Sequence, residues 1–349
     1  MAALDDARYI ALTRALYERT PRPIHSNFLV AATVVYADAS GALQLAHGVN
    51  SESCVLSSCI CAERTALVQL RLAPTGWRYV RAVYITASSE GLITPGLLCR
   101  EFLSEFSEAA CAVREAHEAA AGGGGGGSGG SSGGSSSSSL PHADPEGDIA
   151  VVLFSAAGAV ARHSLRSLFP HPSPYHGVPN ANLEGAGRAL AQRAAGASAE
   201  ALGALLGGGA GQAAADLCAA VAALARQAHE QDDLYPVHLA AGVLFADGER
   251  LLARQLKGLE YGCSADAVVR LSGALARARP VALLVQADQH GNLLAPSAPA
   301  RALLTEHAAR LGIAAGTRVL LHDARSGALL ALPPAALASD APAIRTGSQ

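Results

Sequence analysis

Apolar residues recur along the first part of the chain with two periods, one typical of helices and one typical of strands. Residues 4–19 carry apolar positions at helical spacing, which predicts a first helix. A run rich in Val and Ala over 28–36 turns at residues 38–41 into a second run over 42–47, and this pattern predicts a β-hairpin. The same criteria predict a helix over 62–72, a strand over 80–86 and a helix over 99–118.

A tract of almost pure glycine and serine, residues 122–139, interrupts this pattern. Such a composition cannot bury apolar surface and is typical of disordered chain. Residues 148–154 predict another strand, and a turn at Gly158 leads to a partner strand that ends at Ser164. Because an isolated hairpin is marginal in water, we expect it to join the sheet that begins before the tract. The tract is therefore predicted to be a disordered insertion, about 119–146, inside a first domain over 1–182.

From residue 239 the chain loosely repeats its first domain. The parallel segments are 240–247 with 31–38, 263–267 with 60–64, 281–287 with 80–86, and 296–301 with 95–100. Their order and spacing predict a second domain over 233–340. The Ala- and Leu-rich residues 183–232 predict a helical connector, with partial disorder around 207–209 as the alternative.

Composition narrows the classes of function. The 349 residues are 50% hydrophobic and carry a formal net charge of −3, with no Lys/Arg cluster. We therefore do not expect general binding to the phosphate backbone of a polynucleotide. No run of apolar residues is long enough for a membrane span, and the acidic N-terminus resembles no targeting segment, so we expect a cytosolic (cytoplasmic) protein. Of the seven cysteines, four (Cys54, Cys59, Cys61 and Cys99) lie in or near one motif, which favours a reduced compartment over a disulfide framework.

Two of these cysteines stand at the predicted starts of two helices. Cys61 precedes the helix over 62–72, and Cys99 follows Pro95, a residue that favours helix entry. A thiolate at a helix start is stabilised by unpaired N–H groups and by the helix dipole. We therefore predict that Cys61 and Cys99 bind one zinc ion and leave a coordination position for water. Glu63 lies close enough to take a proton from that water, or else it serves only as a first-turn partner of the helix dipole.

Three segments carry a family resemblance. Ser26-Asn27-Phe28-Leu29-Val30-Ala31-Ala32, Asn50-Ser51-Glu52 and Cys61-Ala62-Glu63-Arg64 resemble motifs of the nucleoside-metabolising cytidine deaminases. The resemblance implies a three-layer α/β/α fold with a mixed sheet, duplicated here, and a homodimer. It also implies hydrolytic deamination of cytidine or deoxycytidine by zinc-activated water, with Glu63 as the proton shuttle.

The resemblance further implies roles for residues that bind the pyrimidine nucleoside. Asn50 and Glu52 would hold the ribose hydroxyls, Phe28 would pack on the nucleoside, and the backbone at Ala62 would meet the pyrimidine edge. Ordinary alternatives stay open: a core position for Phe28, a turn for Asn50 and a solvated carboxylate for Glu52. Arg64 and Arg100 would relieve the negative charge of the thiolates, or else are surface arginines.

The sequence departs from the family pattern at Gly96, where family members carry a third zinc-binding cysteine. Catalytic zinc normally keeps three protein ligands, so the loss predicts weakened metal binding. Cys59 or Cys54 could substitute. The alternative function is a catalytically impaired pseudoenzyme, or a nucleoside-binding or scaffold module, that kept the fold. In the second copy, Ser264, Ser297 and Ala300 occupy the expected ligand positions and Asp266 that of Glu63. Because neither a neutral hydroxyl nor a methyl group is a useful zinc ligand, the second copy is predicted to bind none.

Overall fold

The structure is a computed structural model that describes residues 4–122, 148–207, 209–228, 231–232, 235–259, 263–275 and 279–339. The chain divides into two compact units, of which the first ends at Leu168 and the second spans Phe169–Ser339. This boundary precedes the one expected at residue 182. No helix among the described residues has the length and apolar character to cross a membrane.

The first unit is built on a five-stranded mixed sheet of order β2-β1-β3-β4-β5. β1 lies antiparallel to β2 and β3, β3 is parallel to β4, and β4 is antiparallel to β5. The strands are β1 (Val30–Ala37), β2 (Leu43–Val49), β3 (Tyr79–Ala87), β4 (Ala150–Phe154) and β5 (Val160–Ser164). Both faces of β1, an interior strand of this sheet, are buried, which matches its unbroken Val- and Ala-rich sequence.

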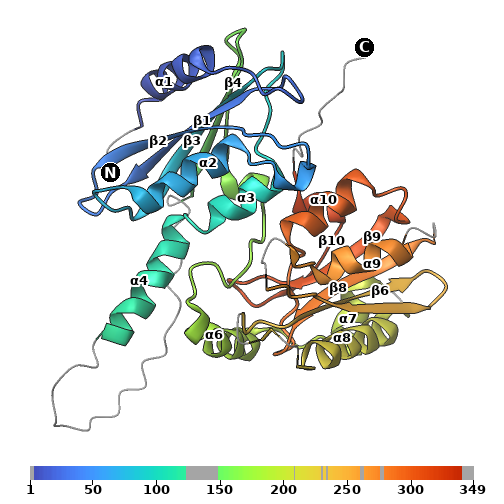
Figure 1. Cartoon of the computed structure of the whole chain (residues 1–349). Helices are drawn as coiled ribbons and strands as arrows, with labels where there is room; N and C mark the ends of the chain where they lie inside the picture. The colour runs from blue at the N-terminus through green and yellow to red at the C-terminus, as the bar shows by residue number, and fades with distance from the viewer. Residues whose placement is uncertain are drawn as a thin grey trace, which may run out of the picture. The chain divides into compact units, whose positions relative to one another are not determined.

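Helices cover both faces of this sheet, so the unit has three layers (Figure 1). α1 (Asp6–Arg19) packs on β1 and β3, and α2 (Ala62–Gln69) packs on β1 and β2 from the other side. α3 (Leu97–Ser104) contacts α2, and α4 (Glu108–Gly122) and the short α5 (Leu165–Leu168) complete the unit. The single helix expected over 99–118 is thus two helices, separated by a turn at 105–107.

The predicted first helix is present, but its buried side chains differ from the expected apolar set. Tyr9 and Thr13 are buried, whereas Leu12 is exposed. Thr13 can face the sheet because its hydroxyl donates to the Thr33 hydroxyl at 2.7 Å and also lies 2.8 Å from the Tyr9 carbonyl oxygen. A buried hydroxyl with these partners is satisfied, so polarity alone does not place it outside.

The hairpin after the Gly/Ser tract returns to the first sheet, as predicted. β4 pairs with β3 in parallel, and β5 closes the edge beside β4. The tract therefore interrupts one unit rather than joining two. Residues 123–147, which include most of the predicted insertion, lie outside the described residues.

The second unit repeats the first strand by strand. Its sheet has the order β10-β9-β8-β6-β7, with the same sequence of parallel and antiparallel neighbours. The strands are β6 (Leu239–Phe245), β7 (Arg250–Arg254), β8 (Val281–Asp288), β9 (Ile313–His322) and β10 (Leu329–Leu332). Even the register shift between β1 and β3 at Val35/Tyr36 recurs between β6 and β8 at Leu244/Phe245. The predicted duplication is confirmed.

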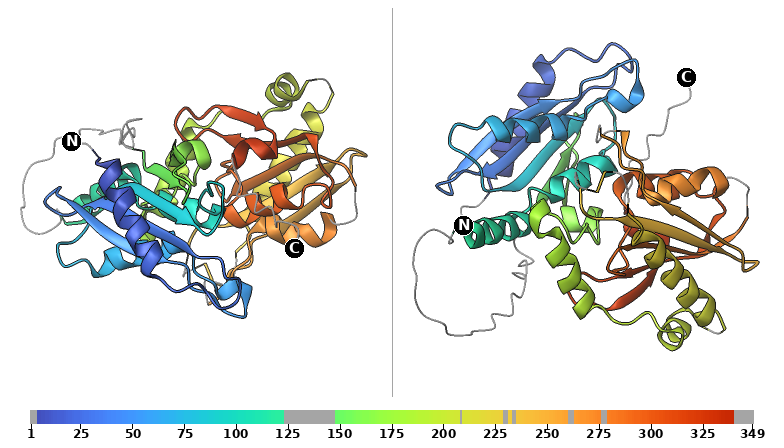
Figure 2. Two further views of the ribbon diagram at one scale, coloured as in Figure 1. Left: turned by 90° about the horizontal axis from the view of Figure 1, so that it is seen from above. Right: turned by 60° about the horizontal axis from the view of Figure 1, so that its bottom comes forward.

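Residues expected to form a connector contribute a helical layer to the second unit. α6 (Asn180–Arg193), α7 (Ala199–Leu206) and α8 (Gly211–Ala225) all belong to it. α8 packs on β6 and β8, as α1 packs on β1 and β3, through Leu217 and Val221. α9 (Ala267–Leu275) and α10 (Ala298–Glu306) lie against the opposite face of the sheet, as Figures 1 and 2 show. The second copy thus begins at α8, because the sheet needs a helix on that face to bury its apolar side chains.

Candidate metal and catalytic site

The starts of α2 and α3 bring two sulfur atoms and one carboxyl group together. Cys61 is the N-cap of α2, Glu63 lies in its first turn, and Cys99 lies in the first turn of α3. One ligand atom from each of these residues lies within 4.8 Å of the other two. Cys99 is fully buried and Glu63 is 3% exposed, whereas Cys61 is half-buried. Solvent or a substrate therefore reaches the cluster from the side of Cys61, its least buried member.

The three groups alter one another's protonation. The hydrogen bond with the Cys99 thiol, followed by the charge of Arg64, lowers the pKa of Cys61 to about 6. That same hydrogen bond and burial raise the pKa of Cys99. Burial, and then the Cys61 charge, raise the pKa of Glu63 to about 7. A carboxyl group with a pKa near neutrality can both accept and release a proton at physiological pH.

The two arginines next to the motif have different surroundings. Arg64 donates from Nη2 to the Cys59 carbonyl oxygen at 3.1 Å, and its charge lowers the pKa of Cys61 as expected. Arg100 is buried, so it is not a surface arginine, and it donates to the carbonyl oxygens of Pro95 and Leu168 at 2.8 and 2.6 Å. These bonds fasten the loop before α3 to α5, so Arg100 holds the position of the helix that carries Cys99.

Gly96 is the N-cap of α3 and offers no side-chain ligand. A Cβ built on it would meet nothing within 4 Å, and its φ of −59° and ψ of 155° suit any L residue. The two candidate substitutes lie elsewhere. The Cys59 sulfur contacts the backbone of Ser53 at 3.4 Å, and Cys54 is exposed. Neither joins the cluster of potential metal ligands found among the described residues.

Of the residues expected to hold a nucleoside, Phe28 precedes β1, and Asn50 and Glu52 follow β2. The Asn50 amide accepts from the Val30 N–H at 2.7 Å and donates to the Phe28 carbonyl oxygen at 2.9 Å. The Glu52 carboxylate accepts from the N–H of Ser26 at 3.0 Å and from its hydroxyl, which lowers the pKa of Glu52. Asn50 therefore fixes the start of β1, and Glu52 fixes the loop before it. Phe28 is partly buried, and Ala62 is buried as the first residue of α2.

Gly48 is a positioning residue that the motifs did not reveal. A Cβ at this point of β2 would lie 2.2 Å from the Ala62 carbonyl oxygen and 2.5 Å from the Ala66 nitrogen. Real Cβ atoms do not approach backbone atoms so closely. Only glycine at this position therefore allows α2 to pack so close to β2. Its single sequence signal is a glycine within a strand pattern, which can mark a close backbone approach.

Comparison with known proteins gives the family. A cytidine deaminase from Sporosarcina psychrophila is 30% identical over 110 residues, which cover 32% of this chain and 76% of that protein. The chain belongs to the cytidine deaminase family. No family model matches the sequence.

Solved cytidine deaminases resemble the chain more loosely. The enzyme from Burkholderia pseudomallei is 23% identical, and the match covers 48% of this chain and 99% of that chain with a TM-score of 0.34. The enzyme from Mycobacterium leprae is 17% identical over the same shares, with a TM-score of 0.30.

In the second unit of this deaminase homologue, the structure shifts the expected alignment by two residues. Ile60 bridges Ser51 just before α2, and Ala265 bridges Leu256 just before α9. Asp266 therefore corresponds to Cys61, and the buried Val268 corresponds to Glu63. Asp266 accepts from the N–H of Val268 at 2.7 Å and caps α9. The prediction that Asp266 stands in for Glu63 is wrong, because the bridges Ser51–Ile60 and Leu256–Ala265 close loops of equal length and so fix which residues of the two copies correspond.

Proposed function

We propose that the first unit is a zinc-dependent hydrolase that converts cytidine or deoxycytidine and water into the uridine product and ammonia. The observation that supports this proposal most is the meeting of Cys61, Glu63 and Cys99 within 4.8 Å at two helix starts. Two thiolates with a carboxylate beside them are a donor set that suits zinc. The open space beside Gly96 leaves room for a water molecule or substrate.

Cys61 and Cys99 would hold the metal, and when bound it would supply Lewis-acid activation of a water molecule. Glu63 would accept a proton from that water and deliver it to the ring nitrogen, and would then carry the proton of the new C4 hydroxyl group to the departing amine. The pKa of about 7 suits both directions of transfer. Burial of Glu63 and Cys99 would exclude competing water.

Substrate binding is proposed for Phe28, Asn50, Glu52 and the backbone of Ala62. The side chains of Asn50 and Glu52 hydrogen-bond backbone groups of residues 26–30. These bonds would keep the loop rigid where it faces the ribose. A homodimer is part of the same proposal, and light scattering on the purified full chain measures it. A monomer at assay concentrations would contradict this part.

A catalytically silent relative is the second candidate, and Gly96 is the observation that favours it. Metal analysis of the purified protein, together with the loss of ultraviolet absorbance on adding cytidine, separates the two. Bound zinc with turnover supports the hydrolase. Metal-free, inactive protein contradicts it.

Gly96→Cys provides the sharpest version of this test, because the space at this N-cap accepts a side chain without a clash. Loss of even an outer-shell partner weakens metal binding about 10–100-fold, so a third thiolate should tighten zinc binding by about 100-fold or more. Competition with a chromophoric chelator measures this affinity. Gly96→Ser is the matched control, since a neutral hydroxyl should add little. Equal affinity of both variants and the wild type would show that residue 96 does not face the metal.

A further inference from the structure

The two cysteines of the first unit lie close enough to react with each other. The sulfur atoms of Cys61 and Cys99 lie within 4.8 Å and share a hydrogen bond. The S–S bond of a disulfide is about 2.0 Å long, so the two atoms need to approach by less than about 3 Å. Cys61 is an N-cap with extended backbone, so the rotamer limits of a helix interior do not hold its side chain. Rotation of the Cys61 side chain can therefore close the gap.

The two sulfur atoms differ in their access to a small oxidant. Cys61 is half-buried and stands at the start of α2, a setting typical of reactive cysteines. Cys99 has no exposed surface, so an oxidant in solution reaches Cys61 first. An accessible cysteine beside a second thiol that can resolve its oxidised form is the arrangement found in redox sensors.

Gly96 leaves this pair without a third thiol. The chain has seven cysteines, and the other five lie outside the cluster found among the described residues. The Cys59 sulfur instead contacts the backbone of Ser53 at 3.4 Å. Each sulfur of the pair therefore has one partner within the site. A site with two protein ligands also holds zinc less tightly than one with three, so its thiols are metal-free for more of the time.

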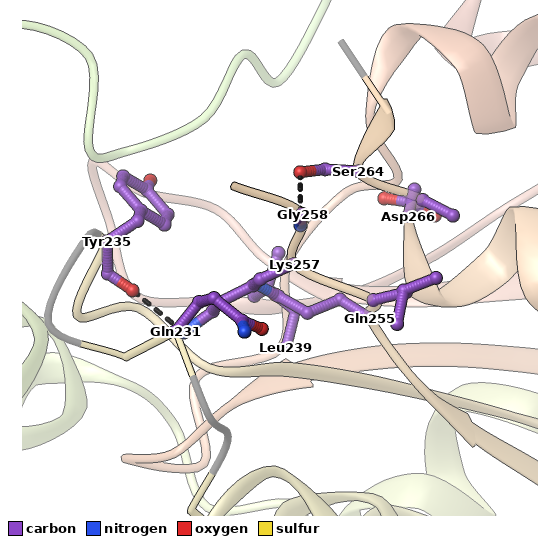
Figure 3. A pocket seen from close by; sticks show the side chains of 10 residues that line it. Gln231, Tyr235, Leu239, Gln255, Lys257, Gly258, Ser264 and Asp266 are labelled. Atoms are coloured by element: carbon purple, nitrogen blue, oxygen red, sulfur yellow. Dashed lines mark hydrogen bonds between the residues drawn. The ribbon is translucent and has the colours of Figure 1, made fainter. Parts of the chain in front are cut away.

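The second unit builds the same two helix starts without sulfur. Asp266 corresponds to Cys61, and Ala300 corresponds to Cys99. In Figure 3, Asp266 lies with Ser264 on one side of a cavity, and neither side chain reacts with a peroxide. The arrangement of helices therefore forms without a sulfur pair, so the pair in the first unit serves chemistry rather than the fold.

We propose that hydrogen peroxide converts Cys61 and Cys99 of the metal-free chain into a reversible disulfide that abolishes zinc binding. The Cys61 sulfur attacks one peroxide oxygen, the O–O bond breaks, and the departing hydroxide takes the Cys61 thiol proton and leaves as water. The Cys99 sulfur then attacks the sulfenic acid on Cys61. The S–O bond breaks, and its hydroxide leaves as water with the Cys99 proton. The peroxide gains the two electrons that the two thiols lose.

The disulfide removes both sulfur donors of the site at once, because zinc binds thiolates. Its effect on turnover rests on the proposed function: in a zinc-dependent hydrolase, oxidation stops deamination and a thiol reductant restores it. The bond itself requires neither zinc nor turnover, so it can be tested on the metal-free chain.

Treatment of the full chain with hydrogen peroxide, after a chelator has removed metal, tests the pair. Peptide mass spectrometry identifies which cysteines are linked, and we expect a bond between Cys61 and Cys99. Loss of even an outer-shell partner weakens metal binding about 10–100-fold, so loss of both thiolates should lower zinc affinity about 100-fold or more. Competition with a chromophoric chelator measures this affinity, and dithiothreitol should restore it.

Two variants identify the roles of the cysteines. Cys99→Ala removes the resolving thiol, so peroxide should leave a sulfenic acid on Cys61 that dimedone traps. Cys59→Ser is the matched control, since it removes a nearby sulfur that lies outside the cluster, and it should leave the bond between Cys61 and Cys99 unchanged. Circular dichroism melting confirms that each variant is folded.

The exposed Cys263 of the second unit shows whether the peroxide dose is sufficient. Reduced Cys61 and Cys99 at a dose that oxidises Cys263 would overturn the inference, as would a bond from either one to another cysteine. A chain that binds zinc and deaminates cytidine but forms no such bond refutes the inference alone. A chain that forms the bond but shows no turnover when reduced and supplied with zinc refutes the hydrolase alone.

Discussion

At the scale of single residues, the site depends on how three ionisable side chains share protons. Cys61 and Cys99 share a hydrogen bond that favours the thiolate on Cys61. Glu63 is surrounded by protein and faces that negative charge, so its carboxyl group retains a proton up to a pH of about 7. The proposed chemistry requires Glu63 to exchange that proton.

Replacement of Glu63 by glutamine keeps the shape of the side chain and removes its proton transfer. We expect Glu63→Gln to lower kcat for cytidine by about 10²–10⁴-fold, the usual contribution of a positioned acid–base group. The decrease in ultraviolet absorbance measures turnover. Inductively coupled plasma mass spectrometry measures bound zinc. Zinc content should stay at the wild-type level. Retained turnover would refute the proton-shuttle role, and lost zinc would make Glu63 a metal ligand.

The raised pKa of Glu63 also predicts how stability changes with pH after zinc has been removed by a chelator. The unfolded chain releases this proton near the ordinary pKa of 4.5, whereas the folded protein holds it to about 7. The stabilisation is therefore complete below pH 4.5 and is lost as the pH rises through 7. The loss in the free energy of unfolding is on the order of 3 kcal/mol.

Urea unfolding at a series of pH values measures this effect. Glu63→Gln cannot titrate, so the difference in stability between the wild type and the variant should shrink from pH 4.5 to pH 7. A difference that stays constant over this range would mean that Glu63 titrates normally in the folded protein.

At the scale of elements, the site forms where the starts of α2 and α3 meet. Gly48 allows α2 to lie close to β2, and Arg100 fastens the loop that leads into α3. Neither residue belongs to the cluster of potential metal ligands, yet each holds a helix that carries a cysteine. Motif spacing predicted both helix starts, but it could not predict what sets their separation, because that depends on contacts between segments distant in the chain.

Gly48→Ala should push α2 away from β2, because its methyl group would overlap the Ala62 carbonyl oxygen. We expect a loss of about 1–3 kcal/mol in the free energy of unfolding, typical of overpacking, together with weaker zinc binding. Gly91→Ala is the control, since a Cβ there meets nothing within 4 Å. Denaturant unfolding and metal competition measure both effects. Equal stability of the two variants would contradict the close packing at Gly48.

At the scale of the whole molecule, one topology occurs twice with different chemistry. The positions of Cys61, Glu63, Gly96 and Cys99 correspond to Asp266, Val268, Ser297 and Ala300. The folding pattern survives this change because it depends on the burial of the strands, whereas metal binding depends on individual donor atoms. The second copy keeps the layers and loses the sulfur ligands.

This difference predicts at most one zinc ion per chain. Cys61→Ser should remove the bound zinc, and Asp266→Asn at the corresponding position of the second unit should leave it unchanged, since one carboxylate is a poor zinc site. Plasma mass spectrometry with a protein assay gives the ratio. Two zinc ions per chain, or loss of zinc in Asp266→Asn, would show that the second unit also binds metal.

The sequence by itself determined the elements, the duplication and the candidate donors. Hydrophobic periodicity reflects burial on strand and helix faces, and the Cys61 and Cys99 motifs mark helix starts, so both can be seen in a linear chain. The tertiary structure alone decided which residues meet. In the folded chain α8 packs on the second sheet, and Asp266 lies at the position that corresponds to Cys61. The Cys59 sulfur contacts the backbone of Ser53 and lies outside the cluster, and the close approach of α2 to β2 requires glycine at position 48. These outcomes depend on distances between segments far apart in sequence, and only packing of the folded chain sets those distances.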